Sequence, residues 1–117
     1  REAKQQLVVS TEALSQALRR VALLSAERSH AVKLELGPNQ LVLSSNNPDL
    51  GEAREELDVD YAGEEIVIAF NARYLMESLA AMHAKEVRLG FQDGLSPAQL
   101  TPTNDPDTLS VVMPMRV

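Results

Sequence analysis

Short stretches of this chain alternate apolar and polar residues, and two longer stretches repeat apolar residues every three or four positions. Alternation is the period of a strand with one buried face, and the longer spacing is that of a helix with one buried side. Helices are expected after residues 10–11 and after residue 71. Strands are expected at residues 5–9, 32–36, 41–43, 57–61, 66–70, 87–91, 98–100 and 109–113.

The first helix has a defined start and a defined buried side. Ser10 or Thr11 can cap its amino end, and the charge of Glu12 suits the first turn. Leu23 lies roughly opposite the buried side, so it is either an ordinary exposed leucine or part of an interface, and Leu24 borders that side. The residues expected to face the core are Leu14, Ala17, Leu18, Val21 and Ser25.

The second helix is expected to be capped by Asn71. His83 falls at its end, where a partial positive charge suits the helix dipole. The expected inward residues are Leu75, Leu79 and Met82, and the expected outward residues are Arg73, Glu77 and Ala80.

Three strands have patterns of their own. Residues 66–70 are apolar throughout, which predicts a central strand covered on both faces. Residues 57–61 carry an acidic face. In residues 109–113, the alternation predicts that Leu109, Val111 and Met113 face the core. The apolar residues without an expected inward role are Val112, Met115 and Val117, which form either a loose end or a binding surface.

The order of predicted elements is strand, helix and three strands, repeated twice. Such a chain is α+β, with two similar halves whose mainly antiparallel sheets pack against the two helices. Its 117 residues suit one domain, residues 1–117. A first residue other than Met is consistent with a fragment of a longer subunit.

The composition narrows the classes of function. No apolar run is long enough to span a bilayer, and the absence of cysteine fits a cytoplasmic protein. The net charge of −6 comes from residues 49–65, which hold eight acids and one base, whereas the rest of the chain is nearly neutral. Two Phe, two Tyr and no Trp make a base-stacking nucleic-acid platform improbable.

The sequence contains no combination of residues typical of catalysis. His30 and His83 fall on different elements and have no cysteine to complete a metal site, and no glycine-rich phosphate loop follows a strand. We therefore expect no enzyme activity, no metal and no cofactor. Four basic residues near the helices form either an ordinary helix surface or a weak contact with DNA: Arg19, Arg20, Arg73 and Lys85.

Five stretches carry a resemblance to a known family. They are ALRRVALLS at residues 17–25, SNNP at 45–48, LDV at 57–59, FNARY at 70–74 and VVMPMR at 111–116. In this order and across nearly all of the chain, they resemble the third of three domains of the bacterial DNA polymerase III beta subunit, the sliding clamp. A final Val117, where Leu is common, is a small departure.

The resemblance implies a DNA-clamp fold and a non-catalytic accessory subunit of a DNA polymerase. In the family, two three-domain subunits close head to tail into a ring around duplex DNA, with helices lining the hole and sheets outside. A cleft between the second and third domains receives short peptides of polymerases, the clamp loader and repair proteins, typically Gln followed by Leu and Phe anchors. The resemblance assigns this chain's Asn71, Tyr74, Pro97, Val111, Val112, Met113, Pro114, Met115 and Arg116 to that cleft. Pro97 stands where Ser is frequent.

The same resemblance implies two further surfaces. Arg19, Arg20, Arg73 and Lys85 would face the DNA without sequence specificity. The dimer interface of the full-length protein would include Leu23, Leu24, Glu52 and Glu55. The first domain that they would meet is missing from this chain, so we expect a monomer.

Two other classes of function stay open. The chain could be a stand-alone peptide-binding adaptor domain without a DNA role, or an enzyme fragment. Two further domains of the same pattern upstream in the gene would favour the clamp over the adaptor.

Overall fold

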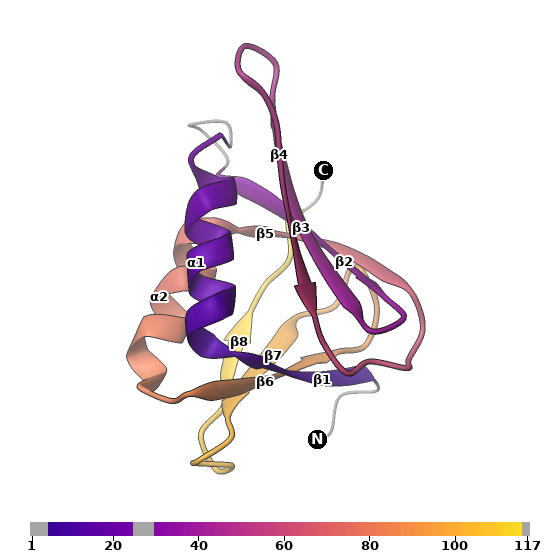
Figure 1. The fold of residues 1–117 in the computed structure, drawn as a ribbon. Helices are drawn as coiled ribbons and strands as arrows, with labels where there is room; N and C mark the ends of the chain where they lie inside the picture. Colours follow the sequence, from indigo (N-terminus) through magenta and orange to yellow (C-terminus); the bar gives the residue numbers. More distant parts are fainter. Residues whose placement is uncertain (1–4, 25–29, 116–117) are drawn as a thin grey trace.

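The computed structural model describes residues 5–24 and 30–115, and their order of elements is strand, helix and three strands, twice, as predicted (Figure 1). The elements are β1 (Gln5–Ser10), α1 (Thr11–Ala22), β2 (Ala31–Gly37), β3 (Gln40–Asn47), β4 (Gly51–Asp58), β5 (Ile66–Asn71), α2 (Ala72–Met82), β6 (Glu86–Phe91), β7 (Ala98–Pro102) and β8 (Ser110–Val112).

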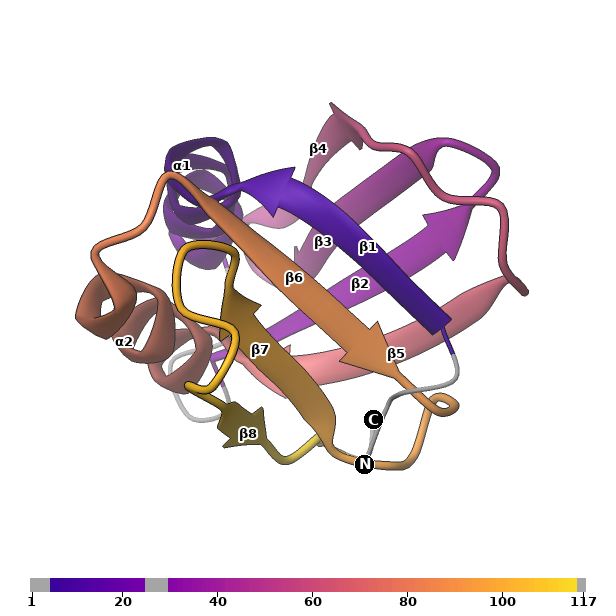
Figure 2. The same cartoon turned by 90° about the horizontal axis from the view of Figure 1, so that it is seen from below.

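Within these residues, the strands form two antiparallel four-stranded sheets, with the orders β1-β6-β7-β8 and β4-β3-β2-β5. The first strand of each half pairs into the sheet of the other half, since β1 pairs with β6 and β5 pairs with β2. The sheets lie one over the other with their strands crossing, and the two helices lie along one flank (Figure 2). One apolar core joins both sheets and both helices. The α+β fold with two helices and antiparallel sheets is thus confirmed.

The two helices follow their sequence patterns closely. Ser10 caps α1 by accepting a hydrogen bond from the Ala13 N–H at 3.2 Å, and Asn71 caps α2 by accepting one from the Arg73 N–H at 2.9 Å. α2 ends at His83, whose φ of 51° is left-handed. The predicted inward residues are buried, apart from Met82, which is partly buried, and Ser25, which lies outside the described residues.

The prediction for β4 was wrong in its bounds, because the strand covers residues 51–58 rather than 57–61. β4 pairs with the whole length of β3, from Asn47↔Gly51 to Gln40↔Asp58, and this long-range pairing sets its extent. Tyr61 is buried although it lies beyond the strand. The acidic segment has no continuous apolar face, so its alternation did not reveal a strand.

The prediction that residues 66–70 form a central strand was also wrong. β5 is an edge strand, and its Val67 is 55% exposed. Ala69 is nevertheless buried, because the C-terminal segment crosses the strand edge and the Met115 N–H donates to the Ala69 carbonyl at 2.7 Å. At Ala69 the open edge of β5 is therefore met by a later segment rather than by a second neighbouring strand.

The phase predicted for the last strand was inverted. Leu109, Val111 and Met113 are exposed, whereas Val112 is buried. Val112 is paired with Ala98, and both side chains face the core. The inversion leaves a row of apolar side chains on the surface at the C-terminal edge of the molecule.

Candidate functional site

A groove of about 470 Å³ lies between α2 and the C-terminal segment. The structure brings together here most of the residues that the sequence assigned to a peptide cleft. Ser78, which the sequence did not single out, also lines the groove. The lining residues are Asn71, Tyr74, Ser78, Val111, Val112, Met113, Pro114 and Met115.

One wall of the groove is the amino-terminal half of α2. Asn71, Tyr74 and Ser78 are separated by three and four residues, a spacing that places side chains on one helix face. The same spacing could have revealed Ser78 from the sequence. The Asn71 side-chain oxygen accepts the helix-capping bond, so its amide N–H₂ group is the part that can donate to a ligand. Tyr74 is 63% exposed and offers an apolar ring with a polar tip.

The other wall is the end of β8 and the segment after it. Val111 is 53% exposed and Met113 is 66% exposed, so both present apolar surface to solvent. Pro114 has no backbone N–H and cannot continue a strand ladder. The bond from Met115 to Ala69 then holds the segment against β5. This wall is therefore fixed to the body of the domain at both ends.

Two assigned residues are not placed in the groove. Pro97 is exposed and lies just before β7, next to the Ala98 that pairs with Val112, but it does not line the groove. Arg116 lies outside the described residues. The described residues that line the groove include no charged side chain, so this part of it suits apolar anchors and a few backbone hydrogen bonds.

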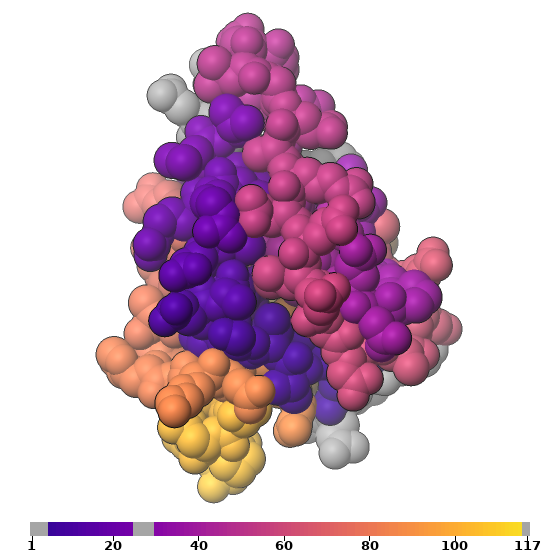
Figure 3. Space-filling model, viewed as in Figure 1, coloured from indigo at the N-terminus to yellow at the C-terminus, as the bar shows by residue number. Residues whose placement is uncertain are grey.

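A second candidate surface lies where α1 meets the β3–β4 hairpin. The hairpin projects beyond the body of the domain (Figure 1), and α1 and β4 form adjoining parts of one face (Figure 3). Leu23, at the end of α1, is 78% exposed, and Leu24 is half-buried. β4 is an edge strand, so one side of its backbone has no partner strand within the described residues.

The structure separates the two acids assigned to this surface. Glu52 and Glu55 are three residues apart on a strand, so they point to opposite faces of β4. Glu55 faces α1 and accepts a hydrogen bond from the Arg20 guanidinium at 2.9 Å, which raises the pKa of Arg20. Arg20 and Glu55, assigned to two different sites, are thus partners in one ion pair.

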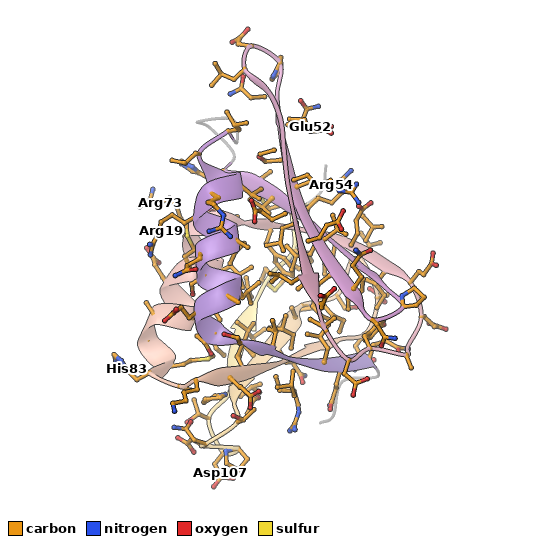
Figure 4. The ribbon with its side chains drawn as sticks, viewed as in Figure 1. Arg19, Glu52, Arg54, Arg73, His83 and Asp107 are labelled. Atoms are coloured by element: carbon orange, nitrogen blue, oxygen red, sulfur yellow. The ribbon has the colours of Figure 1, made fainter. Side chains whose placement is uncertain are left out.

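The remaining basic residues are exposed. Arg19 and Arg73 point away from the sheets on the helix side of the molecule (Figure 4), and Lys85 precedes β6. The Lys85 carbonyl accepts a hydrogen bond from the Thr11 N–H at 2.8 Å, so its backbone joins the start of α1 to β6. Because Arg20 forms an ion pair with Glu55, Arg19, Arg73 and Lys85 are the residues of the proposed DNA-facing set whose charge is left for contact with phosphates.

The described residues hold no group of three His, Asp or Glu side chains placed to bind a metal ion. In the same part of the chain, no helix has the length and apolar character needed to cross a membrane.

Comparison with known proteins gives consistent results. Residues 1–116 match the family model described as DNA polymerase III beta subunit, C-terminal domain. Beta sliding clamps of Pseudomonas putida and Escherichia coli are 40% and 39% identical over 111 residues, which are 95% of this chain and 30% of each relative. A sliding clamp from Pseudomonas aeruginosa, crystallised with griselimycin, superposes with a TM-score of 0.95 at 34% identity, and the match covers all of this chain and 32% of that one. The chain thus spans about a third of the length of the proteins that it matches.

Proposed function

This chain belongs to the family of the DNA polymerase III beta subunit, as its C-terminal domain, and from this we propose that it is one third of the subunit of a ring-shaped sliding clamp. The ring encircles duplex DNA and holds a polymerase on its template, so the subunit is a replication processivity factor. It acts by topology and binding rather than by catalysis, in the bacterial cytoplasm.

The observation that carries the proposal is the groove beside the C-terminal segment. Partner peptides from the polymerase and the clamp loader, with Leu and Phe anchors, would cover the exposed parts of Tyr74, Val111 and Met113. Burying one such anchor is worth about 1.5–3 kcal/mol. The Asn71 amide would donate to a peptide carbonyl, while its oxygen keeps the helix cap. Association costs offset part of this gain, so we expect weak binding by this chain alone.

Ring closure would use the surface where α1 meets the hairpin. Leu23 and Leu24 would supply apolar contact, and the edge of β4 that has no partner strand in the described part of the chain would offer its backbone groups to an adjoining strand. Glu52 lies on the outward face of β4 and can meet a basic partner surface. Glu55 is already paired with Arg20, so its part in the interface requires that pair to be shared or broken.

The helix flank would face the DNA. Arg19, Arg73 and Lys85 can contact phosphates without reading sequence, and such contacts weaken as salt rises. With a net charge of −6 and no closed ring, this chain should bind duplex DNA more weakly than about 1 µM at physiological salt.

Three peptide titrations test the groove. A Gln-Leu-Phe-type peptide is titrated into the wild-type chain, into Met113→Ala and into Leu50→Ala, which removes an exposed leucine from the distant β3–β4 turn. We expect Met113→Ala to weaken binding about tenfold, because it removes apolar surface from the anchor site. Leu50→Ala should bind as wild type does. Equal binding by Met113→Ala would show that the groove is not the peptide site.

The stand-alone adaptor is the second candidate, and it shares the same groove. An experiment on the whole protein distinguishes a clamp from an adaptor. A clamp stays bound to closed circular DNA and slides off when the circle is cut, whereas an adaptor does neither.

A further inference from the structure

A second hollow adjoins the groove along α2. It has a volume of about 740 Å³ and lies between the later turns of α2 and the loop joining β7 to β8. Tyr74 and Ser78 line both the hollow and the groove. At their boundary the Ser110 hydroxyl donates to the Ser78 hydroxyl at 3.3 Å, which joins β8 to α2. A chain lying in the groove can therefore continue into the hollow past Tyr74.

The hollow differs from the groove in its chemistry. Its described lining includes the carboxylates of Glu77 and Asp105 and no lysine or arginine, while Ala81 and Met82 contribute apolar surface. His83 lies at the end of α2, and the tip of the loop carries another acid, Asp107 (Figure 4). The hollow thus combines an apolar surface with two acidic groups, beside a groove whose described lining carries no charged side chain.

The loop that carries Asp105 is held by its own hydrogen bonds. The Asp105 N–H donates to the Pro102 carbonyl and the Thr108 N–H donates to the Asp105 carbonyl, each at 3.1 Å. The Thr108 hydroxyl also donates to the Asp105 carboxylate. The acidic wall is therefore in place before any ligand arrives, and binding there requires no reordering of the loop.

We infer that this hollow receives a lysine or arginine side chain from the same peptide that occupies the groove. The inference rests on the proposed function of the groove and adds a preference for basic residues beside the apolar anchors. The aliphatic stem of such a side chain can lie on Ala81 and Met82 while its charged head reaches Glu77 and Asp105. Since exposed ion pairs are weak, the hollow selects among peptides rather than supplying most of their affinity.

The test compares peptides that differ only outside the anchors. The 117-residue chain is titrated with a Gln-Leu-Phe-type peptide without extension. It is also titrated with versions of this peptide that carry two added lysines, or two added glutamates, at the amino end or at the carboxyl end. Lysines at one of the two ends should tighten binding about two- to fivefold. Glutamates at that end should weaken it, and both effects should shrink as salt is raised.

Matched variants separate the hollow from the overall negative charge of the molecule. Glu77→Gln with Asp105→Asn should abolish the gain from lysine and leave binding of the unextended peptide unchanged. Glu65→Gln with Asp60→Asn changes the net charge equally at exposed positions near the start of β5 and should keep the gain.

Each result decides between the two proposals. If the unextended peptide binds but lysine brings no gain, or brings a gain that survives in the Glu77 and Asp105 variant, the inference about the hollow is wrong and the groove stands. If the unextended peptide does not bind at all, the groove proposal fails and this inference fails with it.

Discussion

At the scale of single residues, Asn71 caps a helix and also has the peptide-binding role proposed above, and the two roles can be separated. Its side-chain oxygen caps α2 through the Arg73 N–H, and the residue also lines the groove, where its amide N–H₂ group is the side-chain donor. A serine hydroxyl at this position can replace the oxygen that caps the helix, but it is too short to replace the amide group as a donor to a ligand. Helix capping and ligand binding at this position are therefore chemically distinct.

We predict that Asn71→Ser keeps the stability of the domain but weakens peptide binding, because serine caps helices well and lacks the amide donor. Asn71→Ala should lower the free energy of unfolding by about 1 kcal/mol as well as weaken binding. Thermal denaturation and peptide titration of both variants check this. Full peptide affinity in Asn71→Ser would exclude the amide from recognition.

Asp93 holds the turn between β6 and β7. Its carboxylate accepts hydrogen bonds from the Leu95 N–H at 2.8 Å and the Ser96 N–H at 2.7 Å, and these bonds, together with the Ser96 hydroxyl, lower the pKa of Asp93. The neighbouring Gly94 must be glycine, because a Cβ there would lie 2.4 Å from the Val67 carbonyl oxygen.

The lowered pKa of Asp93 predicts a pH dependence of stability. The stabilising bonds are fully present above the unfolded pKa of about 4 and are lost as pH falls through the lower folded pKa. We expect Asp93→Asn to reduce the dependence of Tm on pH between about 5 and 2. Asp60→Asn removes an equal charge from an exposed loop and is the control. If both variants follow the wild-type curve, the turn does not contribute through Asp93.

At the scale of elements, the C-terminal segment is the part of the fold that makes the groove. β8 places Val112 in the core and turns Val111 and Met113 outward, and the segment beyond Pro114 is then fastened to β5 by Met115. The short edge strand β8 thus has one buried residue that attaches it to the core and exposed apolar residues that form a wall of the groove. We expect the position of this wall to depend on the hydrogen bond from Met115 to Ala69, and the apolar core not to depend on it.

We predict that deleting residues 115–117 weakens peptide binding more than Met115→Ala does. The alanine variant loses apolar surface but keeps the N–H that binds the Ala69 carbonyl, whereas the deletion loses both. Both proteins should remain folded, because these residues follow the last strand. Peptide titration with circular dichroism as the folding check measures this. A folded deletion that binds as tightly as wild type would remove this segment from the binding site.

At the scale of the whole molecule, this domain has surfaces suited to neighbours on either side. Within the described residues, β4 and β8 are edge strands of two different sheets, and Leu23 is exposed at the end of α1, which packs against β4. Different surfaces at two ends suit head-to-tail contacts, which close into rings when the rotation permits. The matched relatives are about three times as long as this chain, so in such a protein other domains would supply the complementary surfaces.

We predict that this chain alone is a monomer at micromolar concentration, which sedimentation can measure. If the full-length subunit forms the proposed ring through Leu23, Leu23→Lys should open it, because the variant would place a charge in an apolar contact. Leu50→Lys, at the hairpin turn, is the comparison. A full-length Leu23→Lys protein with unchanged dimer stability would remove Leu23 from the interface.

The sequence by itself determined the order of the elements along the chain and most of the residues that the helices bury, although it misplaced the bounds of β4 and the buried face of β8. Caps at Ser10 and Asn71, the apolar sides of both helices and the order of strands are local features, because they depend on residues within a few positions of one another. The stretch at residues 111–116 also pointed to the C-terminal segment, and the structure places its described residues beside Asn71 and Tyr74.

Only the tertiary structure decided which face of each strand is buried and which strands are neighbours. Alternation defines two faces of a strand but does not say which one meets the core. Either Val112 or Met113 could therefore have been the buried residue, and the pairing of β8 with β7 decides that it is Val112. The exchange of β1 and β5 between the halves, the edge position of β5 and the pairing of Arg20 with Glu55 likewise depend on contacts between residues far apart in the chain. The groove is formed by residues 71–78 and 111–115, which are far apart in the chain, so its geometry follows from the fold rather than from any one segment.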